Sequence, residues 1–276
     1  MRIEIQNLEF SYPSGVEALR GLSFTIMPGE KLAIVGQNGA GKTTLVKHFN
    51  GLLKPTNGWV LVGDWDTREH TVAKLASRVG YVYQNPDEQL FSRTVEQEVA
   101  VGPKNLGYAQ ERVQELVAGA LALTHLQDQR QTNPYDLSPT WRKMVAMASV
   151  IAMDTPVIIF DEPTTGQDAN SVASIGEIVD VLHQRGKTVI TITHDIDFAA
   201  DHFGRLIAMG QGTVLLDSPM LEGIAQEKIL AATYVDPPQI TRLGMRLGLT
   251  KIVKDTQAFL DTYRNTLSED PPPNRA

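Results

Sequence analysis

The chain has 276 residues, of which 42% are hydrophobic and 21% charged, and its formal net charge is −7. This size fits one large domain, or one domain with a small appendage, and an acidic total argues against nucleic-acid binding as the main role, although a local basic patch could hide within it. The absence of cysteine excludes disulfides and thiolate metal sites.

Residues 1–35 predict strands and turns, because short alternating runs are interrupted at Pro13–Gly15 and Pro28–Gly29. Tyr12 precedes the first turn, where an exposed ring would stack on a nucleobase; alone, it is more typical of a half-buried strand. The N-terminus lacks the apolar core of a signal peptide, and the longest apolar runs, such as Val145 to Met153, are too short to span a bilayer. We therefore expect a soluble chain whose membrane role depends on a partner.

A glycine-rich stretch fits the phosphate-binding pattern G-x-x-x-x-G-K-[ST] at every position. It consists of Gly36, Gln37, Asn38, Gly39, Ala40, Gly41, Lys42 and Thr43. Residues 30–35 before it predict a buried strand, and residues 44–53 after it predict a helix. Glycines allow close backbone approach to phosphate, and the helix start offers free N–H groups and a favourable dipole. Lys42 would reach the β- and γ-phosphates and the Thr43 hydroxyl would ligate Mg²⁺, whereas the alternative is an ordinary turn before a helix.

Further elements follow in chain order. They are strands at 59–62 and 79–83, a mostly helical segment at about 93–153, a strand at 157–162, a helix at 171–184, a strand at 188–193 and a hairpin at 206–216. Within the helical segment, Thr94 and Ser138 are predicted N-caps, and Pro139 begins a helix that runs to Met153. Beyond residue 219 we expect short helices at 241–247 and 255–264, followed by a disordered Pro-rich tail at 268–276.

Polar residues stand at the ends of three predicted strands. Gln84 follows the strand at 79–83, Asp161 and Glu162 end the strand at 157–162, and His194 follows the strand at 188–193. Because ligands bind beyond the carboxyl ends of parallel strands, the two acids should lie where the phosphate loop opens. The non-functional alternatives are that Gln84 is a polar loop residue, that Asp161 and Glu162 are an acid pair at the start of a helix, and that His194 is a capping or core histidine.

In combination these motifs resemble the ATP-binding subunit of an ABC transporter over about residues 1–218, and the energy-coupling-factor (ECF) subfamily most closely. The ECF likeness is carried by Phe10–Pro13, Gly51–Pro55, Gln84–Phe91 and Asp236–Ile240. The resemblance implies an α/β fold: a P-loop (RecA-like) ABC ATPase core with an N-terminal antiparallel β subdomain and a helical insertion at about 93–153. A small C-terminal helical extension, residues 219–267, would add dimer contacts.

The resemblance also implies how ATP is bound. Tyr12 would stack on adenine, and the stretch from Gly39 to Thr44 would hold the phosphates. Glu162 would polarise the attacking water, His194 would contact the γ-phosphate, and Asp168 would communicate across a dimer.

A Mg²⁺ ion is implied as well, ligated by Thr43 and Gln84 and held through water by Asp161. Phosphoryl transfer depends on positioning and charge neutralisation. The predicted catalytic residues are therefore Glu162, His194 and Lys42.

The chain departs from the family in its signature stretch, which is usually Leu-Ser-Gly-Gly-Gln and here reads Leu-Ser-Pro-Thr-Trp from residue 137. In ABC dimers this stretch caps the nucleotide on the opposite phosphate loop, through the serine hydroxyl and the N–H at the second glycine. Ser138 and the N–H of Thr140 remain and are predicted to bind nucleotide, but Pro139 has no N–H and Trp141 is bulkier than glutamine. Either the site still closes in a homodimer, or a different subunit supplies an intact signature in a heterodimer.

The resemblance implies a transport ATPase at the cytoplasmic face of the membrane. Its partners would be a transmembrane coupling protein, a membrane protein that binds a vitamin or a transition-metal ion, and a second ABC ATPase subunit, but no nucleic acid. One alternative is a soluble ABC protein acting on nucleic acid or ribosomes, although the paired ATPase domains or long coiled coil of such proteins are missing. Another is a low-turnover regulatory subunit, which Pro139 favours and the intact Glu162 and His194 disfavour.

Overall fold

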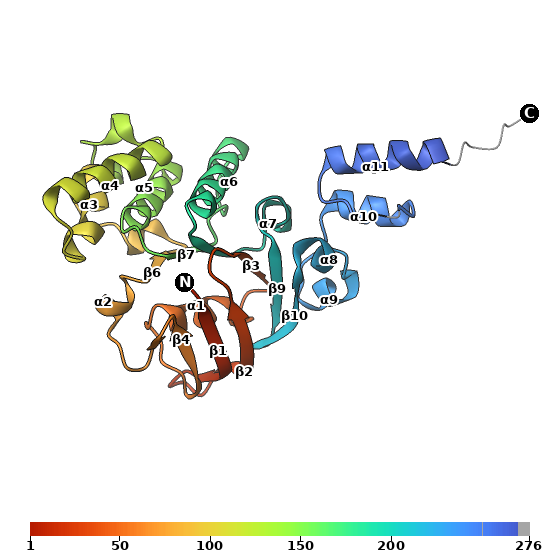
Figure 1. Cartoon of the computed structure of the whole chain (residues 1–276), viewed down its shortest axis with the longest axis horizontal. Helices are drawn as coiled ribbons and strands as arrows, with labels where there is room; N and C mark the ends of the chain where they lie inside the picture. Colours follow the sequence, from red (N-terminus) through yellow and green to blue (C-terminus); the bar gives the residue numbers. More distant parts are fainter. Residues whose placement is uncertain (250, 270–276) are drawn as a thin grey trace, which may run out of the picture.

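The computed structural model describes residues 1–249 and 251–269. Two sheets and a set of helices build the described chain, and the C-terminal helices α10 and α11 extend away from the sheets (Figure 1). Most of the predicted tail, residues 270–276, lies outside the described residues. Its first two positions belong to a helix instead, because α11 runs from Thr256 to Glu269.

The first sheet is antiparallel, as predicted for the N-terminal region, and has the strand order β2-β1-β4-β5. Its strands are β1 (Ile3–Ser11), β2 (Glu17–Ile26), β4 (Asn57–Val62) and β5 (Trp65–Asp66). Alternating apolar residues such as Ile3 and Ile5 are fully buried, because successive side chains of a strand point to opposite faces.

The second sheet has the order β10-β9-β3-β8-β7-β6 and is parallel except for β10. Its strands are β3 (Lys31–Val35), β6 (Val79–Val82), β7 (Val157–Asp161), β8 (Thr188–Ile192), β9 (Arg205–Gly210) and β10 (Thr213–Pro219). The strands β6, β7 and β8 are buried along their whole length, as expected of parallel strands covered on both faces. The carboxyl ends of β3, β7 and β8 therefore meet at one edge, which is where the site forms.

Ten α-helices precede α11 among the described residues. They are α1 (Lys42–Phe49), α2 (Val72–Leu75), α3 (Val95–Asn105), α4 (Gln110–Leu123), α5 (Pro139–Ile151), α6 (Ala169–Gln184), α7 (Ile196–His202), α8 (Met220–Ile224), α9 (Glu227–Ala232) and α10 (Gln239–Arg246). Helices α3, α4 and α5 form the group shown at the upper left of Figure 1. One core lies between α1 and the two sheets, and the other lies between the second sheet and the remaining helices. Among the described residues, none of the helices is both long and apolar enough to cross a membrane.

Two predicted helix ends were wrong, and one helix was missed. Helix α1 ends at Phe49 rather than residue 53, since the chain turns at Gly51 with φ of 74°, where a Cβ atom would lie 2.4 Å from Leu75. Helix α5 ends at Ile151, two residues before the predicted Met153. Helix α7 was not predicted at all, because its seven residues are too few to show a clear helical period.

Candidate functional site

The glycine loop connects β3 to α1 and depends on backbone conformations that favour glycine. Gly36, Gly39 and Gly41 have φ of 144°, 81° and 98°. A Cβ on Gly36 would lie 2.2 Å from the carbonyl oxygen of Met209, and one on Gly41 would lie 2.7 Å from that of Ala18. The loop therefore brings its backbone within reach of an anion at the start of α1, where free N–H groups are available.

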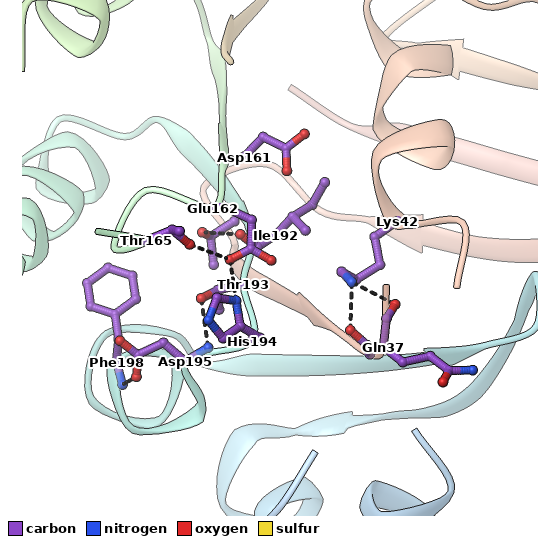
Figure 2. A network of polar contacts seen from close by, with 12 residues as sticks. Gln37, Lys42, Asp161, Glu162, Thr165, Ile192, Thr193, His194, Asp195 and Phe198 are labelled. Atoms are coloured by element: carbon purple, nitrogen blue, oxygen red, sulfur yellow. Dashed lines mark hydrogen bonds and ion pairs between the residues drawn. The ribbon is translucent and has the colours of Figure 1, made fainter. Parts of the chain in front are cut away.

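Lys42 is the first residue of α1 and points back across the loop. Its ammonium nitrogen donates to the carbonyl oxygens of Gly36 at 2.6 Å and Gln37 at 3.0 Å (Figure 2). Burial lowers the pKa of Lys42, while the nearby carboxylates of Glu162 and Asp161 oppose that shift. The loop thus holds a cation directly beside the phosphate-binding backbone.

Asp161 ends β7 and is held by two hydroxyl groups on one of its carboxylate oxygens. Thr43 Oγ1 donates to Asp161 Oδ2 at 3.0 Å, and the Tyr81 hydroxyl donates to the same atom at 2.5 Å. Burial and the charge of Asp161 raise the pKa of Tyr81, so the phenol stays protonated as a donor. The other oxygen, Oδ1, is buried and has no hydrogen-bond partner among the described residues. A buried carboxylate oxygen left unpaired beside a hydroxyl fits a hard divalent cation such as Mg²⁺.

Glu162 leaves the strand in a left-handed conformation, with φ of 50°, and its side chain is almost completely buried. Its Oε2 accepts hydrogen bonds from the Thr165 hydroxyl at 3.2 Å and from His194 Nδ1 at 2.8 Å (Figure 2). The His194 ring itself is largely exposed. The Glu162 carboxylate is thus held between the Thr165 hydroxyl and the solvent-exposed ring of His194.

A cavity of about 290 Å³ is lined by the glycine loop, Asp161 and Glu162. Its predicted site residues are Tyr12, Asn38, Gly39, Ala40, Gly41, Lys42, Thr43, Thr44, Gln84, Asp161 and Glu162. The Tyr12 hydroxyl is hydrogen-bonded to Thr44 Oγ1 at 2.9 Å. Tyr12 is 36% exposed and lines the cavity beside the glycine loop.

The predicted signature residues lie elsewhere. Ser138, Thr140 and Asp168 line a second cavity, of about 340 Å³, together with Trp141. Both Ser138 and Asp168 act as N-caps within the chain: Ser138 Oγ accepts from the Trp141 N–H at 3.4 Å, and Asp168 Oδ1 accepts from the Ser171 N–H at 2.8 Å. A nucleotide role for these residues needs a second chain and stays a prediction.

Sequence reasoning missed Tyr81, Thr165 and Lys143. Tyr81 was predicted only as part of the strand at 79–83, yet its partner on β7 is Ile159, two residues before Asp161, which brings its hydroxyl to the acid. The pairing of β6 with β7 reveals this contact. Lys143 was predicted only as part of the helix from Pro139 to Met153, and its contact depends on the path of that helix past Glu162.

Comparisons with known proteins complete the description. A profile of the ABC transporter family matches residues 19–165. An energy-coupling factor transporter ATP-binding protein, EcfA, of Methanoculleus marisnigri is 37% identical over 270 residues, covering 95% of this chain and 98% of that protein. A putative ABC transporter ATP-binding protein of Caldanaerobacter subterraneus is 39% identical over 248 residues; these cover 90% of this chain, but only 44% of that protein. The solved structure of cbiO1 from Clostridium perfringens, part of the ABC transporter complex cbiONQ, has a TM-score of 0.76 and 32% identity, covering 89% of this chain and 95% of that one.

Proposed function

Because the chain belongs to the ABC transporter family and is an ABC ATPase of the energy-coupling-factor type, we propose that it drives a membrane importer for a vitamin or a transition-metal ion. One observation carries the assignment of the ATP site. The glycine loop, an aspartate with an unpaired buried oxygen, and a glutamate paired with histidine all converge on one edge of the second sheet.

The glycine loop holds the phosphates of ATP. Its backbone N–H groups and the positive end of the α1 dipole face the anion, and Lys42 adds a full charge. The Lys42 ammonium now bonded to the carbonyls of Gly36 and Gln37 is close enough to the loop to bind the terminal phosphates instead. Tyr12 stands at the mouth of the same cavity, where its ring stacks on the adenine.

Thr43, Gln84 and Asp161 are the residues that would hold Mg²⁺. When bound, the ion neutralises charge on the phosphate oxygens during phosphoryl transfer. Tyr81 and Thr43 fix the orientation of the Asp161 carboxylate through Oδ2, which leaves Oδ1 for the ion or its water.

Glu162 orients the attacking water and accepts its proton. The water oxygen forms a bond to the γ-phosphorus of ATP, the bond from phosphorus to the bridging oxygen of ADP breaks, and the products are ADP and phosphate. His194, whose Nδ1 donates to Glu162 Oε2, keeps the carboxylate turned toward the cavity and would place its exposed ring beside the terminal phosphate.

The signature favours a heterodimer with one strong and one weak ATP site. The Ser138 hydroxyl is engaged as an N-cap, Pro139 offers no N–H, and the Trp141 side chain is 39% exposed where the family has glutamine. Thr140 keeps its N–H but adds a branched side chain where the backbone must approach phosphate, and loss of that close contact would cost about 3 kcal/mol, as for one lost oxyanion donor. Because the signature acts on the opposite nucleotide, this chain's own catalytic residues stay competent beside a partner with an intact signature.

The remaining partners follow from the family. A transmembrane coupling protein and a substrate-binding membrane protein would hold the chain at the cytoplasmic face of the membrane, and the loop after Gln84 together with α3–α5 would pass the motion to them. Residues 219–267 would add contacts between the two ATPase subunits.

Two measurements test this function. Mg-ATP titrated into the folded chain should bind, and Lys42→Ala should lose most of that affinity, whereas Lys47→Ala, farther along the same helix, should keep it. Turnover with a partner ATPase should fall about 10²- to 10⁴-fold in Glu162→Gln. An unchanged affinity in Lys42→Ala would refute the ATP site, and vigorous turnover by the purified chain alone, lost in Glu162→Gln, would refute the need for a heterodimer.

A further inference from the structure

Lys143 is a buried lysine whose ammonium contacts only backbone carbonyls. It projects from α5 and is 5% exposed. Its Nζ donates to the carbonyl oxygen of Glu162 at 2.9 Å and reaches that of Thr165 at 3.5 Å. Burial lowers the pKa of Lys143, while the carboxylates of Glu162 and Asp161 oppose the shift. None of the ion pairs among the described residues includes it, so its position is set by these two carbonyls.

The residue that Lys143 holds is in an unfavourable backbone conformation. A non-glycine residue with φ near 50° costs on the order of 1–3 kcal/mol and persists only where its surroundings fix it. Two long-range contacts fix Glu162: its N–H donates to the Ile192 carbonyl of β8 at 2.8 Å, and its carbonyl accepts from Lys143. Lys143 therefore makes one of the two long-range hydrogen bonds to the peptide groups that flank Glu162.

We propose that Lys143 is a positioning residue for hydrolysis, which fixes the backbone of Glu162 and thereby aims its carboxylate at the attacking water. The inference rests on the proposed function of Glu162 as the group that activates water. It does not place Lys143 in contact with the nucleotide, since this residue does not line the cavity of the phosphate loop.

The contact also connects α5 to the catalytic turn. Ser138 caps the first turn of α5, and Lys143 lies five residues farther along the same helix. Two more contacts bind α5 to the loop that carries Gln84: Arg142 pairs with Asp87 at 2.8 Å, and Gln89 donates to the Ala146 carbonyl at 2.8 Å. Helix α5 is thus held both at the loop that carries Gln84 and at the turn that contains Glu162.

The test compares Lys143→Met with Lys187→Met. Lys187 serves as the control, because it is also largely buried and also donates to a backbone carbonyl, that of Asp154, just before β8 begins; unlike Lys143, it also pairs with the Asp154 carboxylate. We expect kcat of Lys143→Met to fall about 10²-fold with KM for Mg-ATP within twofold of the parent, the size of effect of a misplacement near 1 Å. Lys187→Met should be less stable with an unchanged kcat. Should Lys143→Met not fold, Lys143→Gln, which keeps a neutral but shorter donor, is expected to show the same loss.

Two further readouts separate positioning from a purely structural role. In a Glu162→Gln background, Lys143→Met should cause no additional loss of single-turnover hydrolysis. A further loss of similar size in that background would overturn the proposal. So would a kcat of Lys143→Met alone that equals the kcat of the parent. Hydrogen exchange of residues 160–168 should be faster in Lys143→Met alone, and unchanged exchange there would also overturn it. The exchange result stands even if the parent chain hydrolyses no ATP, an outcome that would refute only the proposed function.

Discussion

Tyr81→Phe removes one hydroxyl group and tests how Asp161, the proposed Mg²⁺ ligand, is held. The Tyr81 hydroxyl donates at 2.5 Å to Asp161 Oδ2, which otherwise accepts only from Thr43 among the described residues. Both partners are buried, with Asp161 3% exposed. The substitution keeps the aromatic ring and its packing, so its effect reports on the hydrogen bond.

The size of the effect follows from the charge and the burial. A hydrogen bond to a buried ionised group contributes about 1.5–3 kcal/mol to the free energy of unfolding. Because the pKa of Tyr81 is raised by burial and by Asp161, the phenol donates throughout the working pH range, and the loss should not vary between pH 6 and about 9. Loss of a group that orients a metal ligand should also weaken apparent Mg²⁺ affinity about 10- to 100-fold.

Two assays measure these losses separately. Urea denaturation in a chelator gives the free energy of unfolding without Mg²⁺, and Mg²⁺ titration of ATP turnover gives the apparent affinity. Tyr83→Phe is the matched control, because this ring packs edge-on against Tyr81 and its hydroxyl makes no hydrogen bond with the described residues. If Tyr81→Phe unfolds at the same urea concentration as Tyr83→Phe and needs no more Mg²⁺, the role given to the hydroxyl is wrong.

Two further changes probe the loop and the scaffold. Gly36→Ala places a methyl group 2.2 Å from the Met209 carbonyl and should destabilise the chain by about 3 kcal/mol or more, whereas Gly186→Ala, with φ of 78° and open space around it, should lose only about 1 kcal/mol; equal losses in urea denaturation would contradict the clash. Burial would raise the pKa of Asp154, but Lys187 and Arg112 hold this pKa below its usual value. The stabilisation from the pair with Lys187, about 1 kcal/mol because Asp154 is partly exposed, is therefore complete above the unfolded-state pKa and is lost as pH falls through the lower folded-state pKa. Asp154→Asn should differ from the parent in unfolding free energy at pH 7, and the difference should shrink as the pH falls below the unfolded-state pKa of about 4; a difference that stays constant into acid would refute the pairing.

The sequence predicted the parts of the fold that depend on local pattern. The strands and turns of residues 1–35, the strand before the glycine loop and the mostly helical segment at about 93–153 follow from alternation, apolar runs and helical spacing, and the structure confirms them. Helix ends were less predictable, because they depend on contacts distant in sequence. Gly51 ends α1 against Leu75, which is visible only after folding.

The site shows the same division between local and distant information. Asp161, Glu162 and the loop were recognisable because strand ends and glycine spacing are local features, and the structure brings them to one cavity. Tyr81 and Lys143 were not, since the hydroxyl acts across 80 residues and the ammonium across 19. Their roles depend on strand order and on the path of α5, and neither can be derived from the spacing of one motif.

The left-handed turn at Glu162 explains how two adjacent acids could both face the proposed nucleotide site. Successive side chains of a regular strand point to opposite faces, so an extended Asp161–Glu162 pair would direct its carboxylates apart. Asp161 keeps the strand pairing with Ile192, but Glu162 leaves it at φ of 50°, and both side chains then line the same cavity. The unfavourable conformation therefore allows Asp161 to face the proposed metal site while Glu162 faces the proposed attacking water. The contact from Lys143 is what one expects where such a conformation has to be maintained.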